Sequence, residues 1–299
     1  MLNNRLRKKY GRDNVIASDV RIAPASVASS GPFTYLDIVD SSALSRIVVD
    51  NSITTVIHLV AILSGTGELN PQLALKINNQ GTENVFEVCR THKLKVFVPS
   101  TIAVFGPSSP KFNTPDDCIL RPTTMYGLTK VHTELLGEYY CAKYGLDFRS
   151  LRYPGVISAH GLPGGGTTDY AVDIYHKAIL ENKYTCFLTE NTSLPMIYMP
   201  DLLRATLDLM DADPAKLKRR VYNLGALSFT PKDLTESIQK LSPGFKISYE
   251  PDFRQKIADS WPSSLDDSNA RADWGWKPQY DVPAMTADML KELKIQYKK

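Results

Sequence analysis

Short runs of β-branched and aromatic residues alternate with helical stretches along the first half of this 299-residue chain. That alternation is typical of an α/β fold in which helices cover both faces of a doubly wound parallel sheet. We expect strands at residues 14–19, 33–37, 54–62, 95–101 and 147–157. We expect crossover helices at residues 41–50, 71–92 and 124–144, the first opening at a serine cap.

The composition narrows the class of protein. Of all residues 43% are apolar, which is enough for a large core, and the net charge of +3 is too small to indicate a nucleic-acid partner. No apolar run approaches the roughly 20 residues that a membrane-spanning helix needs. The four cysteines form no Cys-x-x-Cys pair and the five histidines show no zinc-binding spacing. We expect a soluble protein with no metal, no nucleic acid and no membrane partner.

The chain does not open as a dinucleotide-binding fold normally does, with a strand, a glycine-rich turn and a helix whose amino end holds the pyrophosphate. It opens on a cation-rich stretch, Arg5 to Arg12 around Gly11, which is typical of the last turn of that helix. The next strand ends in Asp19, the acidic position that binds the adenosine ribose and favours NAD over NADP. We therefore expect a Rossmann-type sheet that lacks its first strand and glycine-rich turn, with unpaired neighbours in its middle.

After residue 157 the alternation gives way to a glycine-rich loop at 160–168 and then to proline-punctuated segments. This pattern predicts a smaller lobe over the carboxyl edge of the sheet, where open α/β sheets bind ligands. The expected division is an NAD-binding domain at 1–158 and a mainly substrate-binding lobe at 159–299, with about 201–226 returning to the sheet.

Tyr126 and Lys130 lie one helical turn apart, so their side chains share a face. A neighbouring ammonium favours the tyrosinate and is expected to lower the tyrosine pKa, which makes the phenol a usable base for an alcohol proton. Thr101 ends a strand, and we expect its hydroxyl beside the tyrosine. A second copy of the spacing, Tyr139 and Lys143, points to a different face of the same helix and is expected on the surface.

Several segments carry a resemblance to a known family. Pro-Ser-Thr-Ile-Ala-Val-Phe-Gly at 99–106, Arg-Pro-Thr-Thr-Met-Tyr-Gly-Leu-Thr-Lys at 121–130 and Leu-Arg-Tyr-Pro-Gly-Val at 151–156 resemble the extended short-chain dehydrogenases, the NAD-dependent epimerase/dehydratase family. More narrowly, Pro-Gly-Gly-Gly-Thr-Thr-Asp-Tyr-Ala at 163–171, Leu-Pro-Met-Ile-Tyr at 194–198 and Asp-Asp-Ser-Asn-Ala-Arg-Ala-Asp-Trp-Gly-Trp at 266–276 are similar to the L-threonine 3-dehydrogenases within it. The match runs through essentially the whole chain, and the shortened beginning is its one gross departure.

The resemblance implies an oxidoreductase that passes hydride from C3 of L-threonine to NAD and yields 2-amino-3-oxobutanoate, in threonine catabolism towards glycine. Tyr126 would take the hydroxyl proton, Lys130 would lower the tyrosine pKa and hold the nicotinamide ribose, and Thr101 would orient the hydroxyl. It also implies a homodimer paired through helices 71–92 and 124–144. Eukaryotic relatives are mitochondrial, which implies the same location.

The resemblance implies further binding residues. The candidate substrate contacts are Ser64, Ser100, Thr167 and Thr168. The candidate NAD contacts, besides Asp19, Tyr126 and Lys130, are Asp37, Ile38, Leu59, Ala61, Asn78 and Tyr153. Structural alternatives stay open: a strand-end hydroxyl for Ser100, an ordinary capped loop for Thr167 and Thr168, and a buried helix asparagine for Asn78. Trp261 stays open between a lid and a core residue.

Two other functions stay open. A sugar-nucleotide epimerase uses the same tyrosine and lysine but has a larger substrate cleft. Thr167 and Thr168, together with the short glycine-rich loop before them, favour a small amino acid as the substrate. A non-catalytic truncated form would keep these residues without holding NAD, because the pyrophosphate loop is absent. NADH production from L-threonine, with UDP-galactose as the control, separates the three.

Overall fold

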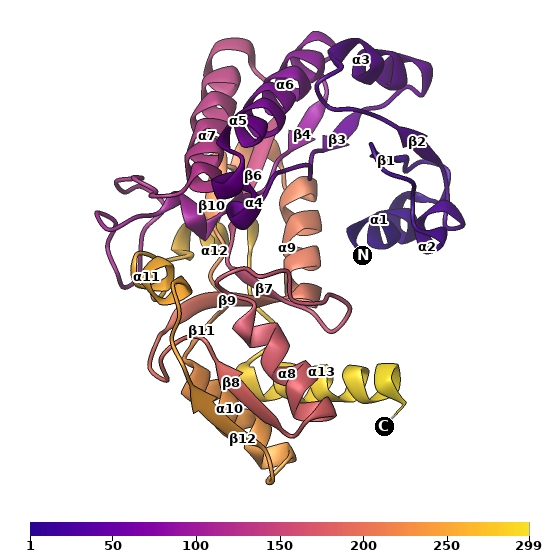
Figure 1. The fold of residues 1–299 in the computed structure, drawn as a ribbon. Coiled ribbons are helices and arrows are strands. Elements are labelled where there is room, and N and C mark those ends of the chain that lie inside the picture. The colour runs from indigo at the N-terminus through magenta and orange to yellow at the C-terminus, as the bar shows by residue number, and fades with distance from the viewer. Residues whose placement is uncertain (299) are drawn as a thin grey trace.

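Residues 1–298 are described by the computed structural model, whose elements are labelled in Figure 1. The helices are α1 Leu2–Tyr10, α2 Ala25–Ala28, α3 Ser41–Asp50, α4 Ser64–Leu69, α5 Pro71–Ala74, α6 Gly81–Thr91, α7 Met125–Tyr144, α8 Tyr170–Leu180, α9 Met199–Asp211, α10 Pro231–Leu241, α11 Arg254–Asp259, α12 Ser268–Trp274 and α13 Val282–Tyr297. The strands are β1 Ala17–Asp19, β2 Phe33–Tyr35, β3 Thr55–Ile57, β4 Lys95–Phe97, β5 Ser100–Thr101, β6 Phe148–Tyr153, β7 Gly155–Ile157, β8 Lys183–Cys186, β9 Leu194–Tyr198, β10 Val221–Asn223, β11 Leu227–Phe229 and β12 Lys246–Tyr249.

The main sheet is parallel, as the alternating sequence predicted. Its strands follow the order β10-β6-β4-β3, and β5 also pairs with β6. Helices α5, α6 and α7 cover one face and α9 lies on the other (Figure 1). Strands β1 and β2 form a separate parallel pair, and within residues 1–298 no strand joins β1 to β3. The interruption that the sequence predicted in the middle of the sheet is therefore present.

Helix α1 is fastened to the β1–β2 pair by a buried cation. The guanidinium of Arg7 donates to the backbone oxygens of Val27 at 3.0 Å and Val15 at 3.3 Å, and also to that of Pro32. The helix ends as expected at Gly11, whose φ of 97° favours glycine. Arg7 lies in the last turn, as predicted for the cation-rich stretch, and it also ties the helix to the segments around β1 and β2.

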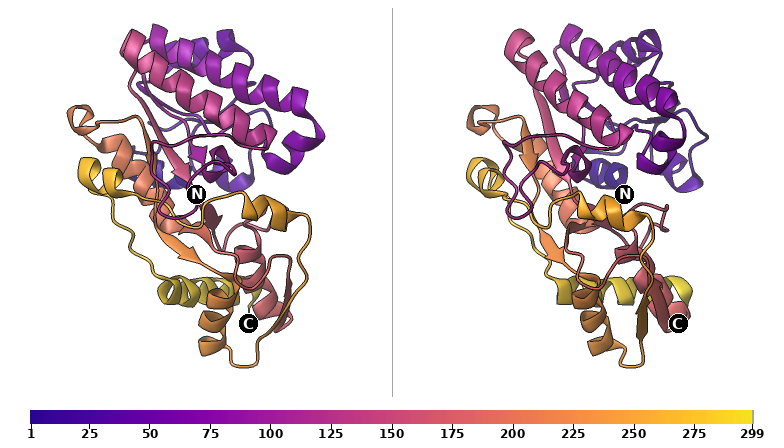
Figure 2. Two further views of the ribbon diagram at one scale, coloured as in Figure 1. Left: turned by 90° about the vertical axis from the view of Figure 1, so that its left-hand side faces the viewer. Right: turned by 60° about the vertical axis from the view of Figure 1, so that its left-hand side comes forward.

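A second lobe lies beside the carboxyl edge of the main sheet (Figure 2). Its three-stranded sheet has the order β11-β9-β7, and β12 pairs with β8. Helices α8, α10 and α13 pack against one another there. Trp261 is 8% exposed within this lobe's hydrophobic cluster, so it is a core residue in this structure.

Two predicted strands and one predicted helix are each divided. Residues 95–101 form β4 and β5, and residues 147–157 form β6 and β7, which lie in different sheets. Pro99 and Pro154 stand at the two breaks, and proline has no N–H to donate to a ladder. Residues 71–92 form α5, a π-helical turn η1 at Leu75–Gln80, and α6. The sequence analysis did not predict α4.

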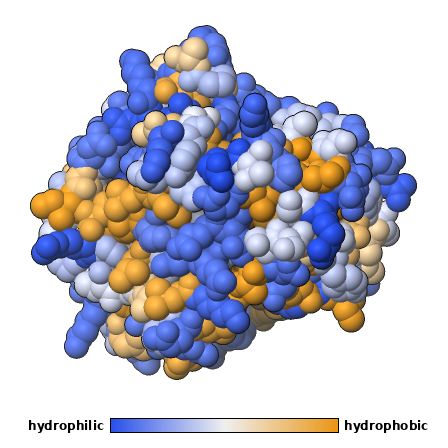
Figure 3. All heavy atoms as spheres, turned by 90° about the horizontal axis from the view of Figure 1, so that it is seen from above, coloured by the Kyte–Doolittle hydropathy of each residue, from blue (hydrophilic) through white to orange (hydrophobic). Residues whose placement is uncertain are grey.

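Three features concern membranes and metals: the surface, the lengths of the helices and the positions of possible metal ligands. Seen from above, the molecule shows separate hydrophobic patches among hydrophilic side chains (Figure 3). No helix among the described residues is long and apolar enough to cross a membrane. Within the same residues, no three His, Cys, Asp or Glu side chains gather as a metal site would require.

Candidate active site

Tyr126 lies in the first turn of α7 because two side chains fix where that helix begins. The Thr124 hydroxyl accepts from the backbone N–H of Gly127 at 3.1 Å, and the Glu68 carboxylate accepts from that of Met125 at 2.7 Å. Both satisfy N–H groups that have no partner within the helix. The capped end of α7 therefore holds Tyr126 at a defined position.

Gly127 lets α7 approach the loop after Thr101 closely. A Cβ atom at Gly127 would lie 2.2 Å from the carbonyl oxygen of Ala103 and 2.6 Å from the Pro122 side chain. Ala103 belongs to the 3₁₀ turn η2, Ile102–Val104, directly after Thr101. The missing side chain brings the first turn of α7 against this edge of the sheet.

Thr101, Tyr126 and Lys130 meet at that contact. The Thr101 hydroxyl hydrogen-bonds the Tyr126 phenol. The Lys130 ammonium donates to the carbonyl oxygen of Pro99 at 2.8 Å and lies 5.8 Å from the centre of the Tyr126 ring. The structure thus brings the three predicted catalytic residues together.

The protonation of the pair differs from the sequence expectation. Burial raises the pKa of Tyr126 to about 12, and the hydrogen bond from Thr101 only partly opposes it. Burial also lowers the pKa of Lys130 to about 8, against the opposing charge of Glu134. The expectation that Lys130 lowers the tyrosine pKa is wrong for this arrangement, because burial penalises the charged form of both groups.

Asn78 is placed behind the lysine by the π-helical turn η1. Its side-chain amide donates to the Ile62 carbonyl oxygen and to the Thr129 hydroxyl, each at 3.0 Å, and accepts from the Ile62 N–H at 2.7 Å. Thr129 precedes Lys130, so Asn78 joins the loop after β3 to the catalytic helix. Isolated π turns often occur at functional sites.

The hydroxyl groups of Ser100 and Tyr153 form hydrogen bonds with other side chains of the protein. Ser100 is 2% exposed and donates to the Glu134 carboxylate. The Tyr153 hydroxyl shares a hydrogen bond of 2.5 Å with Thr206 on α9. This placement favours the strand-end alternative for Ser100.

The remaining substrate candidates lie on two segments. Ser64 is the first residue of α4. Thr167 is 6% exposed. Thr168 packs closely against Gly155, because a Cβ atom at Gly155 would lie 2.7 Å from the Thr168 side chain. Asp169 accepts from the N–H groups of Gly164 at 2.6 Å and Gly166 at 2.9 Å, which shapes the loop before α8.

The NAD candidates lie at the carboxyl ends of β1, β2 and β3. Asp19 ends β1 with a side chain that is 45% exposed, and its carboxylate lies 3.5 Å from the Arg21 guanidinium. Asp37 is exposed and accepts from the Val39 N–H, while Ile38 is buried and packs against Gly81. Leu59 is 53% exposed and Ala61 is partly exposed.

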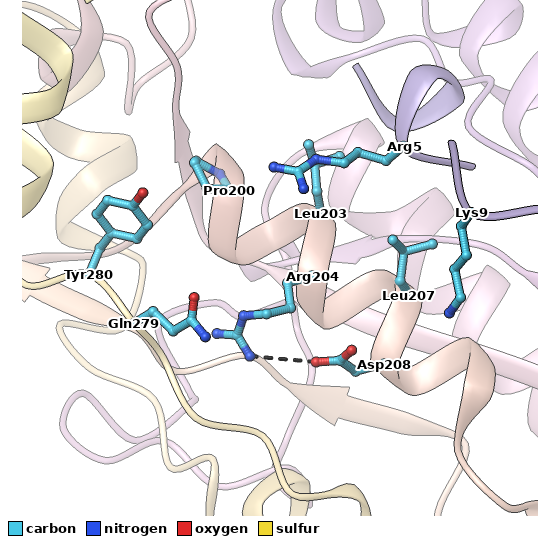
Figure 4. Close-up of a pocket in the computed structure, with 9 residues that line it drawn as sticks. All are labelled: Arg5, Lys9, Pro200, Leu203, Arg204, Leu207, Asp208, Gln279 and Tyr280. Carbon is cyan, nitrogen blue, oxygen red and sulfur yellow. Dashed lines mark hydrogen bonds and ion pairs between the residues drawn. The ribbon is translucent and has the colours of Figure 1, made fainter. Parts of the chain in front are cut away.

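A surface pocket of about 280 Å³ lies between α1 and α9 (Figure 4). Arg5, Lys9 and Arg204 supply its cations, and Arg204 pairs with Asp208 at 3.5 Å. No side chain of the Thr101, Tyr126 and Lys130 group lines it. This pocket is separate from the candidate reaction centre.

A buried ion pair that was not predicted from the sequence lies next to the site. Glu134 and Arg152 are 2% and 5% exposed and form a two-point ion pair at 2.8 and 2.9 Å. The sequence did carry one signal, since Arg149 and Arg152 stand in the run predicted to be a strand at residues 147–157, and both are buried in the structure. A buried cation needs a partner, but the sequence did not show which carboxylate supplies it.

The second tyrosine and lysine pair lies on the surface, as predicted. Tyr139 is 49% exposed, and its hydroxyl accepts from the Lys143 ammonium at 2.7 Å. Solvent surrounds this pair, in contrast to Tyr126 and Lys130. It therefore provides a matched control for experiments on the buried pair.

His58 gives the fold a dependence on acid pH. Burial, with the nearby charge of Lys130, lowers its pKa to about 3 from an ordinary 6.5. Between these values the unfolded chain binds the extra proton, so stability falls as the pH drops through this window. From neutral pH to roughly pH 4.5 we expect His58→Gln to lose about 2–3 kcal/mol less stability than the wild type in urea unfolding. Equal losses would contradict this.

A parallel Rossmann-type sheet that carries a Thr–Tyr–Lys group at its carboxyl edge is the arrangement of the short-chain dehydrogenase class. Residues 2–225 match the NAD dependent epimerase/dehydratase family, and the chain belongs to that family.

Known proteins of high similarity agree with this membership. The mitochondrial L-threonine 3-dehydrogenase of Bos taurus is 54% identical over 286 residues, which cover 95% of this chain and 77% of the relative. The crystal structure of L-threonine dehydrogenase from Phytophthora infestans is 51% identical, with a TM-score of 0.96, over 99% of this chain and 95% of that one. A monomeric L-threonine 3-dehydrogenase from a metagenome is 45% identical, with a TM-score of 0.93, over 99% of this chain and 95% of that one.

Proposed function

We propose that this protein oxidises L-threonine with NAD, by transferring hydride from C3 to the cofactor to give 2-amino-3-oxobutanoate. The observation that carries the proposal is the group of the partly buried Tyr126 and Thr101 with the buried Lys130, in which the threonine hydroxyl bonds the phenol. Relatives that are 45–54% identical and named L-threonine dehydrogenases support this choice of substrate.

Tyr126, Thr101 and Lys130 have separate roles in the proposed oxidation. The Tyr126 phenol passes its own proton to the neutral Lys130 amine as it takes the proton of the substrate's β-hydroxyl, and the Thr101 hydroxyl orients that group beside it. Lys130 holds the released proton as an ammonium on the same helix face as Tyr126. Bound NAD would supply the hydride acceptor. Thr167, Thr168 and Ser64 are proposed to hold the amino acid's polar groups.

The described residues fit a dinucleotide at the edge of β1 and β3. Asp19 offers a partly exposed carboxylate for ribose hydroxyls. Val20 follows Asp19, and Leu59, Val60 and Leu63 lie in the segment after β3; these four side chains are 61, 53, 43 and 62% exposed. Grouped exposed apolar side chains mark a ligand surface. We propose that NAD covers them, with Asp37, Ile38, Ala61, Asn78 and Tyr153 along the same edge.

The division of labour between the lobes is also a proposal. We assign NAD binding to residues 1–158 and most substrate contacts to residues 159–299. The pairing of β10 with β6 supports the return of residues 201–226 to the main sheet.

Assembly and location are proposed on separate grounds. Leu128 and Leu135 are 49 and 59% exposed and form an apolar stripe along α7. We propose that this stripe pairs two copies of the chain, although the solved metagenomic relative is named monomeric. A mass from light scattering equal to one chain would overturn the pairing. The mitochondrial name of the Bos taurus relative supports a mitochondrial location.

NADH formation from L-threonine, with UDP-galactose as the control, tests the proposed function. We expect NADH from L-threonine and no epimerisation of UDP-galactose. Epimerisation without threonine oxidation would favour the sugar-nucleotide alternative. Absence of both activities, together with undetectable NAD binding, would favour a non-catalytic form.

The rate of threonine oxidation should depend on the shared proton of Tyr126 and Lys130. The pair loses its first proton near pH 8, the lowered pKa of Lys130, and can then accept the substrate's proton. We expect kcat/KM to rise about tenfold per pH unit below that value and to level off above it. Arginine does not lose its proton, so Lys130→Arg should move the rise upward by about one unit or more. A profile that is flat, or that is unchanged in the variant, would contradict this.

A further inference from the structure

One face of α7 holds the strand segment at residues 99–101 at three successive positions. Tyr126 bonds the Thr101 hydroxyl, Lys130 donates to the Pro99 carbonyl oxygen at 2.8 Å, and Glu134 accepts from the Ser100 hydroxyl. The three helix residues are spaced four apart, so they lie one above the other. Glu134 is the third contact of a row whose first two are the proposed catalytic pair.

Glu134 is itself fixed from the neighbouring strand. The Arg152 guanidinium donates to its two carboxylate oxygens at 2.9 and 2.8 Å. Arg152 stands opposite Ser100 in the pairing of β5 with β6, one position before the pair of Thr101 with Tyr153. The carboxylate therefore joins the catalytic helix to both strands next to the reacting threonine.

The far side of Arg152 is also satisfied. Its guanidinium donates to the Asp116 carbonyl oxygen at 2.7 Å and to the Asn223 side-chain oxygen at 3.2 Å. Asn223 in turn donates from its backbone N–H to the Asp116 carboxylate at 2.5 Å. A buried polar network whose members are all bonded rigidifies its surroundings.

We propose that Glu134 is a positioning residue for the reaction, acting through Ser100 and Arg152 to hold Tyr126 and Lys130 against Thr101. This inference rests on the proposed function of those three residues. The carboxylate also lies one turn from Lys130, where its negative charge favours the ammonium. Accordingly it raises the pKa of Lys130 against the larger lowering effect of burial.

Glu134→Gln keeps the shape and removes the charge, and Glu236→Gln is its control because Glu236 is exposed on α10, in the other lobe. For Glu134→Gln we expect kcat to fall by about tenfold or more, with KM for L-threonine within about threefold. The rise in the pH profile should move down by about half a unit or more, because the ammonium loses its anion. Glu134→Asp should restore the midpoint, and Glu236→Gln should match the wild type. An unshifted midpoint in Glu134→Gln would overturn the proposal.

A second readout needs neither substrate nor NAD. Selective ¹³C labelling of lysine lets NMR follow the titration of Lys130, whose signal is assigned by its loss in Lys130→Met. A lower Lys130 pKa in Glu134→Gln supports the positioning role, and an unchanged one overturns it. If Glu134→Gln does not fold, the double variant Glu134→Gln with Arg152→Gln is measured in the same way. The second substitution removes the buried guanidinium that has lost its carboxylate partner. If the wild type does not oxidise L-threonine, the proposed function fails, while this titration still decides the role of Glu134.

Discussion

Tyr126→Phe is expected to lower kcat for L-threonine oxidation by about 10³-fold, the scale of a lost general base. Phenylalanine keeps the ring in place and removes only the hydroxyl that bonds Thr101. The loss of one hydrogen bond should change the free energy of unfolding by only about 1 kcal/mol. Steady-state NADH formation and urea unfolding measure the two effects separately.

Tyr139→Phe is the control for that result. Tyr139 has the same spacing to Lys143 but lies 49% exposed on the surface. Its loss should leave kcat within about twofold of the wild type, since no reacting group lies near it. Similar losses in the two variants, or an active Tyr126→Phe enzyme, would show that Tyr126 is not the base.

Gly127→Ala is expected to reduce both stability and activity. The added Cβ atom would lie 2.2 Å from the Ala103 carbonyl oxygen, and a backbone atom cannot turn aside as a flexible side chain can. The first turn of α7 must therefore move away from the loop after Thr101. We expect a loss of about 1–3 kcal/mol in the free energy of unfolding, although alanine's helix propensity returns about 1 kcal/mol. The displaced Tyr126 should lower kcat by about tenfold or more.

Gly161→Ala is the matched control, because no atom lies within 4 Å of a Cβ atom placed there. It should change neither stability nor kcat by a measurable amount. If Gly127→Ala behaved in the same way, the close approach of α7 to η2 would not be what positions Tyr126.

The bounds of an element could be predicted from the sequence where a local residue pattern sets them. Helix α3, Ser41–Asp50, has the predicted bounds, although its cap is Asp40 rather than the expected serine. The strands were predicted too long, because a run of apolar residues does not show where ladder pairing stops. At residues 54–62 only β3, Thr55–Ile57, pairs, and Leu59 and Val60 are exposed instead. These two residues continue the apolar run beyond the last residue of β3.

Part of the candidate site could be predicted from the spacing of residues in the sequence. Tyr126, Lys130 and Thr101 could be predicted because a helical turn and a strand end place them within short range. The raised pKa of Tyr126 could not, since it depends on burial by residues far away in the sequence. Nor could the ion pair of Glu134 with Arg152, because its members lie on different elements and only the folded sheet brings them together.

L-threonine that carries deuterium at C3 tests the proposed hydride transfer most directly. Incubated with NAD and the 299-residue protein, this substrate should transfer one deuterium to the reduced cofactor, which mass spectrometry detects. The turnover should be slower than with unlabelled L-threonine, and the transfer should disappear in Tyr126→Phe. Reduced cofactor without deuterium, or transfer that persists in Tyr126→Phe, would contradict the proposed chemistry.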